Sequence, residues 1–444
     1  MRKALLLLLF CQLALAQLEP QWSYSPGGMA LAAAVQSDGL AAAAGFDSGK
    51  AALLGADGSP IWEKDYGERV TAALVSADGS RIAFAHGRTL SLLDAQGNEL
   101  WSAGIGEAAV SAAMTRDGGA VAVSTSRAVM LFSNGTLLWN HSTVGQVNSV
   151  AISSQRSIFG GLPDGYVQRW ELDGSPAERL SMGGVINAVA VSSDGAIVAA
   201  GGEGRRVYLA GRDGVLKWKL DTHDEISALA LSPDADYAVA GTTAGDVYLV
   251  EKDGEVVLQH DVKERVERAA VSDDGGRFAV AHGGSVDLFD VEKHLEGRLV
   301  AILALLNRSV ESGADLSFAE ELYAGANSAM LGKDYASAMR FAKAAENATA
   351  TAVAQARAQG ERQITLADEA LAATRAEGLG FLVGGQLAAA QERASNAGAS
   401  MGKGNTALPR MRRAEQPMTR SQQATPQRFT LSQGWGCSGC SSCW

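Results

Sequence analysis

The sequence predicts a seven-bladed all-β propeller, followed by a smaller all-α helical hairpin module and a disordered tail. The first observation is a unit of strand, Asp-Gly turn and strand that occurs seven times at steps of 38–40 residues. The second is that each period has room for four short β-rich segments separated by turn signals. Four strands in about 40 residues are typical of a propeller blade. The seven copies are marked by Asp38, Asp78, Asp117, Gln155, Asp194, Asp234 and Asp274.

The fourth strand of the repeat carries a tryptophan in several copies. It ends in Gly-x-x-x-Trp at residues 58–62, 97–101, 135–139 and 214–218. A large flat ring that recurs once per blade is best used as a wedge between neighbouring blades. We therefore interpret these tryptophans as packing residues and not as a cofactor site.

The Gly-x-x-x-Trp motif resembles the tryptophan-docking motif of PQQ-like (pyrroloquinoline-quinone-type) propeller repeats. The Ser-x-Asp-Gly hairpins also look like the WD-type repeats of exported prokaryotic proteins. The resemblance covers residues 21–292 and implies the fold, but many activities share this fold. The quinone dehydrogenases of that superfamily carry long active-site insertions and a calcium site. Blades of 38–40 residues leave no room for these, so we expect no cofactor.

The first sixteen residues have the pattern of a signal peptide. Arg2 and Lys3 precede an apolar run, and Ala14-Leu15-Ala16 fits the small-x-small cleavage pattern. Cleavage there would make Gln17 the first residue of an exported protein, either secreted or held at the cell envelope or periplasm. A lipid anchor on Cys11 is disfavoured because large residues precede it. No other stretch is long and apolar enough to span a membrane.

The propeller is expected to occupy residues 17–292. Residues 21–24 look like a fourth strand placed before the first hairpin. Each blade would then be one contiguous segment. We therefore expect the ring to close by packing of the first blade on the last, without strand exchange.

An α-helical hairpin module is expected over residues 293–400, because the apolar period changes there from two to about 3.6. A first helix would pack on the propeller, and residues 315–317 would cap a second. A long third helix would run from about residue 336 to 375, with a possible interruption at Gly360, and a last one would cover 386–397. Residues 329–338 resemble the turn of tetratricopeptide-like hairpins. The apolar face of the first helix would consist of Leu295, Leu299, Ile302, Leu303, Leu306 and Val310.

Residues 401–444 read as a disordered basic tail that ends in a Cys-rich motif. Cys437, Cys440 and Cys443 form Cys-x-x-Cys-x-x-Cys, whose thiolates could hold a metal ion, although a fourth ligand is missing. Three thiols in an exported chain favour an intermolecular disulfide or anchoring over metal ligation. A tail without any defined role is the third possibility.

The sequence contains no catalytic motif, so we expect no enzyme. His86 and His282 occupy equivalent places in two repeats, which indicates a packing habit of the repeat. Many carboxylates lie in Asp-Gly turns, where we expect them to form local hydrogen bonds within the turn. The net charge of −11 argues against nucleic acid as a partner. Asn134, Asn140, Asn307 and Asn347 lie in sequons that are either glycosylation sites or chance occurrences.

We therefore predict an exported binding or scaffold protein that engages a protein or glycan partner on one propeller face. Self-association through the helices or through tail disulfides is the second expected interaction. Two alternatives stay open. One is a quinone-dependent or other propeller enzyme, and the other is a redox or metal protein that acts through the Cys-rich tail.

Overall fold

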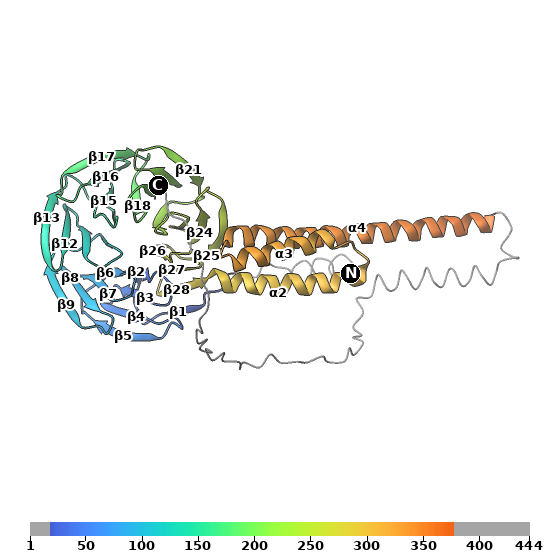
Figure 1. The fold of residues 1–444 in the computed structure, drawn as a ribbon, viewed down its shortest axis with the longest axis horizontal. Helices are drawn as coiled ribbons and strands as arrows, with labels where there is room; N and C mark the ends of the chain where they lie inside the picture. Colours follow the sequence, from blue (N-terminus) through green and yellow to red (C-terminus); the bar gives the residue numbers. More distant parts are fainter. Residues whose placement is uncertain (1–17, 377–444) are drawn as a thin grey trace, which may run out of the picture. The chain divides into compact units, whose positions relative to one another are not determined.

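The structure, a computed structural model, describes residues 18–376 and confirms a seven-bladed β-propeller followed by helices (Figure 1). Each blade is a four-stranded antiparallel sheet. Six of the seven blades take their strands from one contiguous segment, as the repeat predicts. The predicted signal peptide, the predicted helix at residues 386–397 and the Cys-rich tail lie outside the described residues.

The strands of blades 1 to 3 are β2 (Ala30–Val35), β3 (Ala42–Phe46), β4 (Lys50–Leu54) and β5 (Pro60–Asp65); β6 (Val70–Val75), β7 (Arg81–His86), β8 (Thr89–Asp94) and β9 (Glu99–Gly104); and β10 (Ser111–Met114), β11 (Ala120–Ser124), β12 (Ala128–Ser133) and β13 (Thr136–Ser142). Those of blades 4 to 6 are β14 (Ser149–Ile152), β15 (Ile158–Gly161), β16 (Tyr166–Trp170) and β17 (Pro176–Ser181); β18 (Ile186–Val191), β19 (Ile197–Gly202), β20 (Arg206–Gly211) and β21 (Leu216–Asp221); and β22 (Ile226–Leu231), β23 (Tyr237–Thr242), β24 (Asp246–Glu251) and β25 (Val256–Asp261).

The seventh blade is built from both ends of the propeller segment. Its first three strands are β26 (Val266–Val271), β27 (Arg277–His282) and β28 (Ser285–Asp290), and its fourth is β1 (Trp22–Tyr24). The register pairs Trp22 with Leu288 and Tyr24 with Val286. The expectation of closure without strand exchange is therefore wrong. Without β1, the outer edge of β28 would have backbone N–H and C=O groups without hydrogen-bond partners. The N-terminal strand provides these partners.

The innermost strands of the seven blades (β2, β6, β10, β14, β18, β22 and β26) form a closed ring, in which each contacts the next. Because every blade has the same topology, these strands all run in the same direction. We call the end where they begin the entry end, since the loops from the preceding blade enter there. The opposite end carries the Asp-Gly turns, and we call it the hairpin end.

The tryptophans of the repeat lie between blades, which confirms their interpretation as wedges. The indole Nε1 atoms of Trp62, Trp139 and Trp218 each donate a hydrogen bond of 2.9–3.0 Å to a carbonyl of the next blade. Each ring also lies flat against a glycine of that blade. A Cβ atom on Gly58, for example, would stand 2.6 Å from the Trp22 ring. Trp22 thus docks blade 7 on blade 1 by the same ring contact, although its buried Nε1 atom has no hydrogen-bond partner.

The helical part begins directly after the last propeller strand. It consists of α2 (Val291–Ser309), the 3₁₀ turn η1 (Val310–Ser312), α3 (Ser317–Leu331) and α4 (Tyr335–Ala376). Asp290 caps α2 by accepting a hydrogen bond from the Lys293 backbone N–H. Of the six apolar residues expected to face the core, Leu303 and Val310 are exposed. The predicted interruption at Gly360 is absent, because α4 continues through it without a break.

The helices are docked on blades 6 and 7 at the hairpin end. The Tyr335 side chain is 1% exposed and shares a cluster with Tyr237, Phe278 and Phe289. Lys333 forms an ion pair of 2.9 Å with the turn residue Asp274. The compact unit that holds the propeller continues to Gly360, and a second unit begins at Glu361. No helix in the described part of the chain has the length and apolarity needed to cross a bilayer.

Candidate interaction surface

The Asp side chains of the hairpin turns are occupied by their own turns. Asp78 accepts hydrogen bonds from the hydroxyls of Ser76 and Ser80 and from the Ser80 backbone N–H. These hydrogen bonds lower its pKa to about 2. The same serine or threonine contact recurs at Asp117, Asp194, Asp234 and Asp274. These carboxylates serve the hairpins, as their place in the repeat predicts.

An ion pair crosses the propeller axis at the hairpin end. Arg116, in the turn of blade 3, donates hydrogen bonds to both carboxylate oxygens of Asp273 in the turn of blade 7. It also donates to the Ser37 hydroxyl at 3.0 Å. Bidentate pairing of this kind fixes the relative position of two side chains. The turns of three blades are thereby held together at this end of the axis.

His282 belongs to a group of acidic side chains in blade 7. Its Nε2 atom lies 3.0 Å from the Asp287 carboxylate, and its Nδ1 atom lies 3.5 Å from Glu264. The Ser285 hydroxyl contacts the same Nε2 atom as Asp287. A Ser-His-Asp relay needs the serine and the carboxylate on opposite ring nitrogens. The Ser285–His282–Asp287 group therefore does not have the geometry of that relay.

His86 shows the same arrangement in blade 2. It contacts the Ser91 hydroxyl, five residues on, as His282 contacts Asp287. Its ring stacks on Tyr66 with a centroid distance of 3.9 Å. Glu68 stands where Glu264 stands in blade 7, and both glutamates cover the glycine that follows the histidine. The repeat explains both histidines, as predicted.

The two histidines are expected to respond to pH in opposite ways. Burial opposes a charge on His282, but the hydrogen bond and charge of Asp287, with Glu264, raise its pKa. Its stabilising contribution is then complete below pH 6.5, the ordinary histidine pKa, and is lost as pH rises through the raised value. Burial lowers the pKa of His86, so that residue destabilises the fold as pH falls.

We therefore expect His282→Gln to lower the thermal midpoint more at pH 6 than at pH 9. His86→Gln serves as the matched control and should show the reverse trend. Midpoints of both variants and the unmodified protein, measured at the two pH values, test this. Equal losses at both pH values for His282→Gln would contradict the assigned ion pair.

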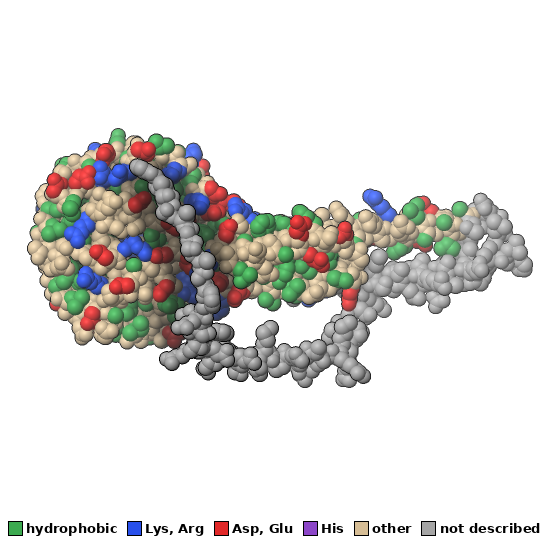
Figure 2. Space-filling view, in the orientation of Figure 1, with side chains coloured by type: hydrophobic (Ala, Val, Ile, Leu, Met, Phe, Trp, Pro, Cys, Tyr) green, Lys and Arg blue, Asp and Glu red, His purple; other side chains and the backbone are tan. Residues whose placement is uncertain are grey.

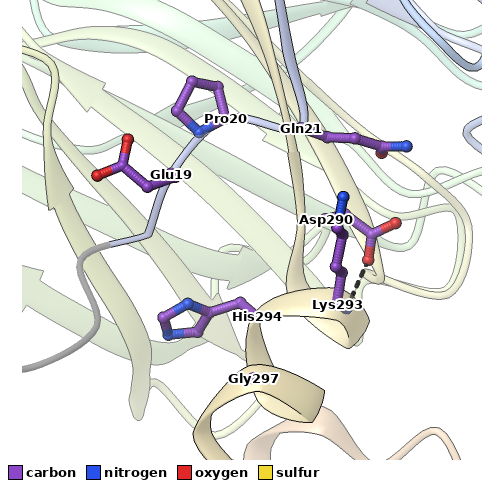
Figure 3. Close-up of a pocket in the computed structure, with 7 residues that line it drawn as sticks. All are labelled: Glu19, Pro20, Gln21, Asp290, Lys293, His294 and Gly297. Atoms are coloured by element: carbon purple, nitrogen blue, oxygen red, sulfur yellow. Dashed lines mark hydrogen bonds between the residues drawn. The ribbon is translucent and has the colours of Figure 1, made fainter.

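The remaining candidate sites do not support metal binding or catalysis within residues 18–376. The predicted ligands Cys437, Cys440 and Cys443 lie outside the described residues. Within residues 18–376, no group of three or more His, Cys, Asp or Glu side chains could hold a metal ion. A shallow pocket of about 250 Å³ lies where residues 19–21 pass the start of α2 (Figure 3). Its Asp290 is already the cap of α2 and the partner of Arg277.

Burial and the charge of Arg298 lower the pKa of His294, which also lines this pocket, to about 4. The imidazole is therefore neutral at physiological pH. The pocket volume is below the ordinary range for small-molecule sites, and its polar groups do not converge on one point. It has the character of a junction between the N-terminal segment and α2.

An exposed surface with two uncharged loops lies at the entry end of blades 4 and 5, bordered by the Asp164–Arg179 ion pair. We call it the blade 4–5 patch and define it by Val144, Gly145, Tyr166, Gly183 and Gly184. Val144 is fully exposed, at 112% of its reference area, and Tyr166 is 37% exposed. The loops at 143–148 and 182–185 contain no charged residue. Exposed apolar and aromatic groups with charged residues at their edge are typical of a protein interface.

The loops of the patch are fixed by a side-chain hydrogen bond, by close backbone packing and by a cation–π contact. The Asn148 side chain donates a hydrogen bond of 3.0 Å to the Ile186 carbonyl and so connects the two loops. A Cβ atom on Gly165 would stand 2.8 Å from the Gly184 carbonyl oxygen, so only glycine fits there. Arg179 lies over the Tyr166 ring at 4.4 Å from its centroid. This surface is at the opposite end from the contacts between the helices and blade 7.

Sequence reasoning did not find the blade 4–5 patch. Its members come from three loops, and each loop alone reads as an ordinary connection between strands. The available signal was the lack of charge in the loops that enter two consecutive blades, at 143–148 and 182–185, in a chain with 20% charged residues. By contrast, the loop entering blade 6 carries Asp224 and Glu225.

A comparison with family models gives one match. The model for PQQ-type repeats, described as the outer membrane protein assembly factor BamB, matches residues 16–165. The match covers less than half of the chain and runs from before β1 to the turn between β15 and β16 in blade 4. A search of curated proteins finds no match to the chain.

Proposed function

We propose that this PQQ-like propeller protein is a non-enzymatic scaffold that binds a protein partner at the cell envelope. The blade 4–5 patch is the observation that carries the proposal, because it presents a fully exposed valine and a partly exposed tyrosine, with the Asp164–Arg179 ion pair at its edge. The similarity to an outer membrane protein assembly factor supports a role in protein assembly at the outer membrane. Export through the predicted signal peptide of residues 1–16 would bring the chain to that compartment.

A protein partner fits this surface better than a glycan or a nucleic acid. Figure 2 shows charged side chains of both signs spread over the visible face of the propeller, with no large basic area. A phosphate backbone needs clustered Lys and Arg. The patch is apolar and rich in exposed backbone, which suits an apolar or extended polypeptide. The occupied turn carboxylates and the His282 geometry give an enzyme no support within residues 18–376.

The test compares two exposed valines at opposite ends of the propeller. A photo-crosslinking residue at position 144 should capture the partner in the native envelope, and one at position 215 should not. Val215 is 62% exposed in the turn before β21, at the hairpin end. With the captured partner purified, Val144→Asp should weaken binding at least tenfold, because a charge is forced into an apolar contact.

Val215→Asp is the matched control and should leave the affinity within a factor of two. Tyr166→Ala should also weaken binding, because exposed aromatic residues are common interface anchors. Equal affinities of the Val144→Asp and Val215→Asp variants would show that the patch is not the contact surface. Circular dichroism and thermal midpoints of each variant exclude loss of the fold as the cause.

A further inference from the structure

Two arginines connect blades 3 and 7 across the axis in opposite directions. At the hairpin end, Arg116 of blade 3 reaches Asp273 of blade 7. At the entry end, Arg268 of blade 7 donates a hydrogen bond of 3.1 Å to the carbonyl of Val110, directly before blade 3. Blades 3 and 7 lie on opposite sides of the ring. Both guanidinium groups therefore lie near the axis, one toward each end.

The two arginines differ in their counter-charge. Arg116 is neutralised by the Asp273 carboxylate. Arg268 has only carbonyl acceptors, those of Val110 and of its neighbour Glu267 at 2.8 Å. The Glu267 carboxylate pairs with Arg265 at 3.2 Å. In the part of the chain that the structure describes, no carboxylate lies within ion-pair distance of Arg268. Arg265, Glu267 and Arg268 together leave one positive charge unbalanced.

The surroundings of Arg268 make this charge costly. Burial lowers the pKa of its guanidinium, Glu267 opposes that effect and Arg265 adds to it. Arg268 is partly exposed, and a partly buried cation without a partner is destabilising unless an anion or water replaces the lost solvation. A guanidinium carries five N–H donors, and the two carbonyl contacts use two of them. Three donors are left for a ligand.

We propose that Arg268 forms an anion-binding site at the entry end of the propeller axis and that its ligand is a carboxylate group. A carboxylate carries the single negative charge that the site lacks, and its two oxygens match the planar fork of a guanidinium. A phosphate dianion would bring an excess of negative charge beside Glu267. The carboxylate can come from a polypeptide, as a C-terminus or an acidic side chain, or from a small free acid.

The ligand would approach from the entry end. At the hairpin end, Arg116, Asp273 and Ser37 meet across the axis. Backbone hydrogen bonds between neighbouring turns add to this closure, including Ala77 N–H to Arg116 O at 2.7 Å and Asp273 N–H to Ser37 O at 2.9 Å. Arg268 stands only two residues into β26, next to the open loops. This proposal does not depend on the partner proposed for the blade 4–5 patch.

The test uses the full chain and acetate as the probe. Thermal midpoints are measured at pH 7 in sodium acetate and in sodium chloride of equal ionic strength. Acetate at ten times its Kd should raise the midpoint of the unmodified protein by about 2 °C. Arg268→Gln should abolish the rise, whereas Arg116→Gln, the matched control, should retain it. Sodium phosphate should give a smaller rise than acetate.

Two outcomes would overturn the site: no acetate effect on the unmodified protein, or an equal effect on Arg268→Gln. If Arg268→Gln does not fold, Arg268→Lys keeps the charge without the fork. It should then bind acetate at least fivefold more weakly by calorimetry, and unchanged binding would overturn the proposal. Peptides with a free or an amidated C-terminus, and with or without an internal Asp, then distinguish the sources. Loss of peptide binding in Arg268→Gln but not in Val144→Asp would separate this site from the proposed patch.

Discussion

Replacing Trp22 by alanine is expected to destabilise the protein by about 3–5 kcal/mol, the usual cost of deleting a large buried aromatic side chain. Trp22 is 9% exposed and lies on Gly58 of blade 1, while its own strand completes blade 7. The substitution therefore removes a wedge between two blades at the point where the ring closes. Chemical denaturation, with amide hydrogen exchange at Val286 and Leu288 on β28, measures both effects.

Trp218→Ala is the matched control for Trp22→Ala. Trp218 is also 9% exposed and docks blade 5 on Gly254 of blade 6, away from the closure. We expect a similar loss of stability, but no faster exchange on β28. A chain that lacks residues 18–24 should be destabilised further than Trp22→Ala, because the edge of β28 then has no partner strand. If that truncated chain unfolds at the same midpoint as one beginning at Gln17, closure by β1 is not what holds the ring.

The second large effect is expected at a buried ion pair between α2 and α4. Arg298 is 8% exposed and donates hydrogen bonds to both carboxylate oxygens of Glu346, at 2.7 and 3.2 Å. Glu346→Ala leaves this guanidinium buried without its counter-charge. The expected loss is about 3 kcal/mol, the lower end for breaking a buried pair, because the Glu346 side chain keeps 26% of its area exposed.

Two further variants make the result specific. The double variant Arg298→Met/Glu346→Leu should recover most of the loss, since an apolar pair of similar size needs no counter-charge. Glu255→Ala breaks the exposed pair with Arg340 and should cost less than about 1 kcal/mol. Denaturation followed by the helical circular dichroism signal gives these values. A loss for Glu346→Ala no larger than that for Glu255→Ala would contradict a stabilising role of the buried pair.

The repeat made the propeller predictable. Its period fixed the number of blades, and the Asp-Gly turns and Gly-x-x-x-Trp motifs marked two of the four strands in most of them. The local role of the turn Asp residues followed from turn chemistry, since a carboxylate two residues from a serine can accept a hydrogen bond from its hydroxyl. The common role of His86 and His282 followed from their equal place in the repeat. All of these depend on neighbours in the chain or on the repeat itself.

The sequence by itself thus determined the fold class, the blade number and the packing role of the tryptophans. Only the tertiary structure decided how the ring closes, because the partner of β1 lies more than 260 residues away at β28. It also decided that Arg268 lacks a counter-charge, since the Glu267 carboxylate pairs with Arg265 and the Val110 carbonyl, which meets Arg268 across the axis, is uncharged. The blade 4–5 patch likewise exists only where three loops meet. Closure, charge balance and surface composition depend on contacts between distant residues, and no local pattern encodes them.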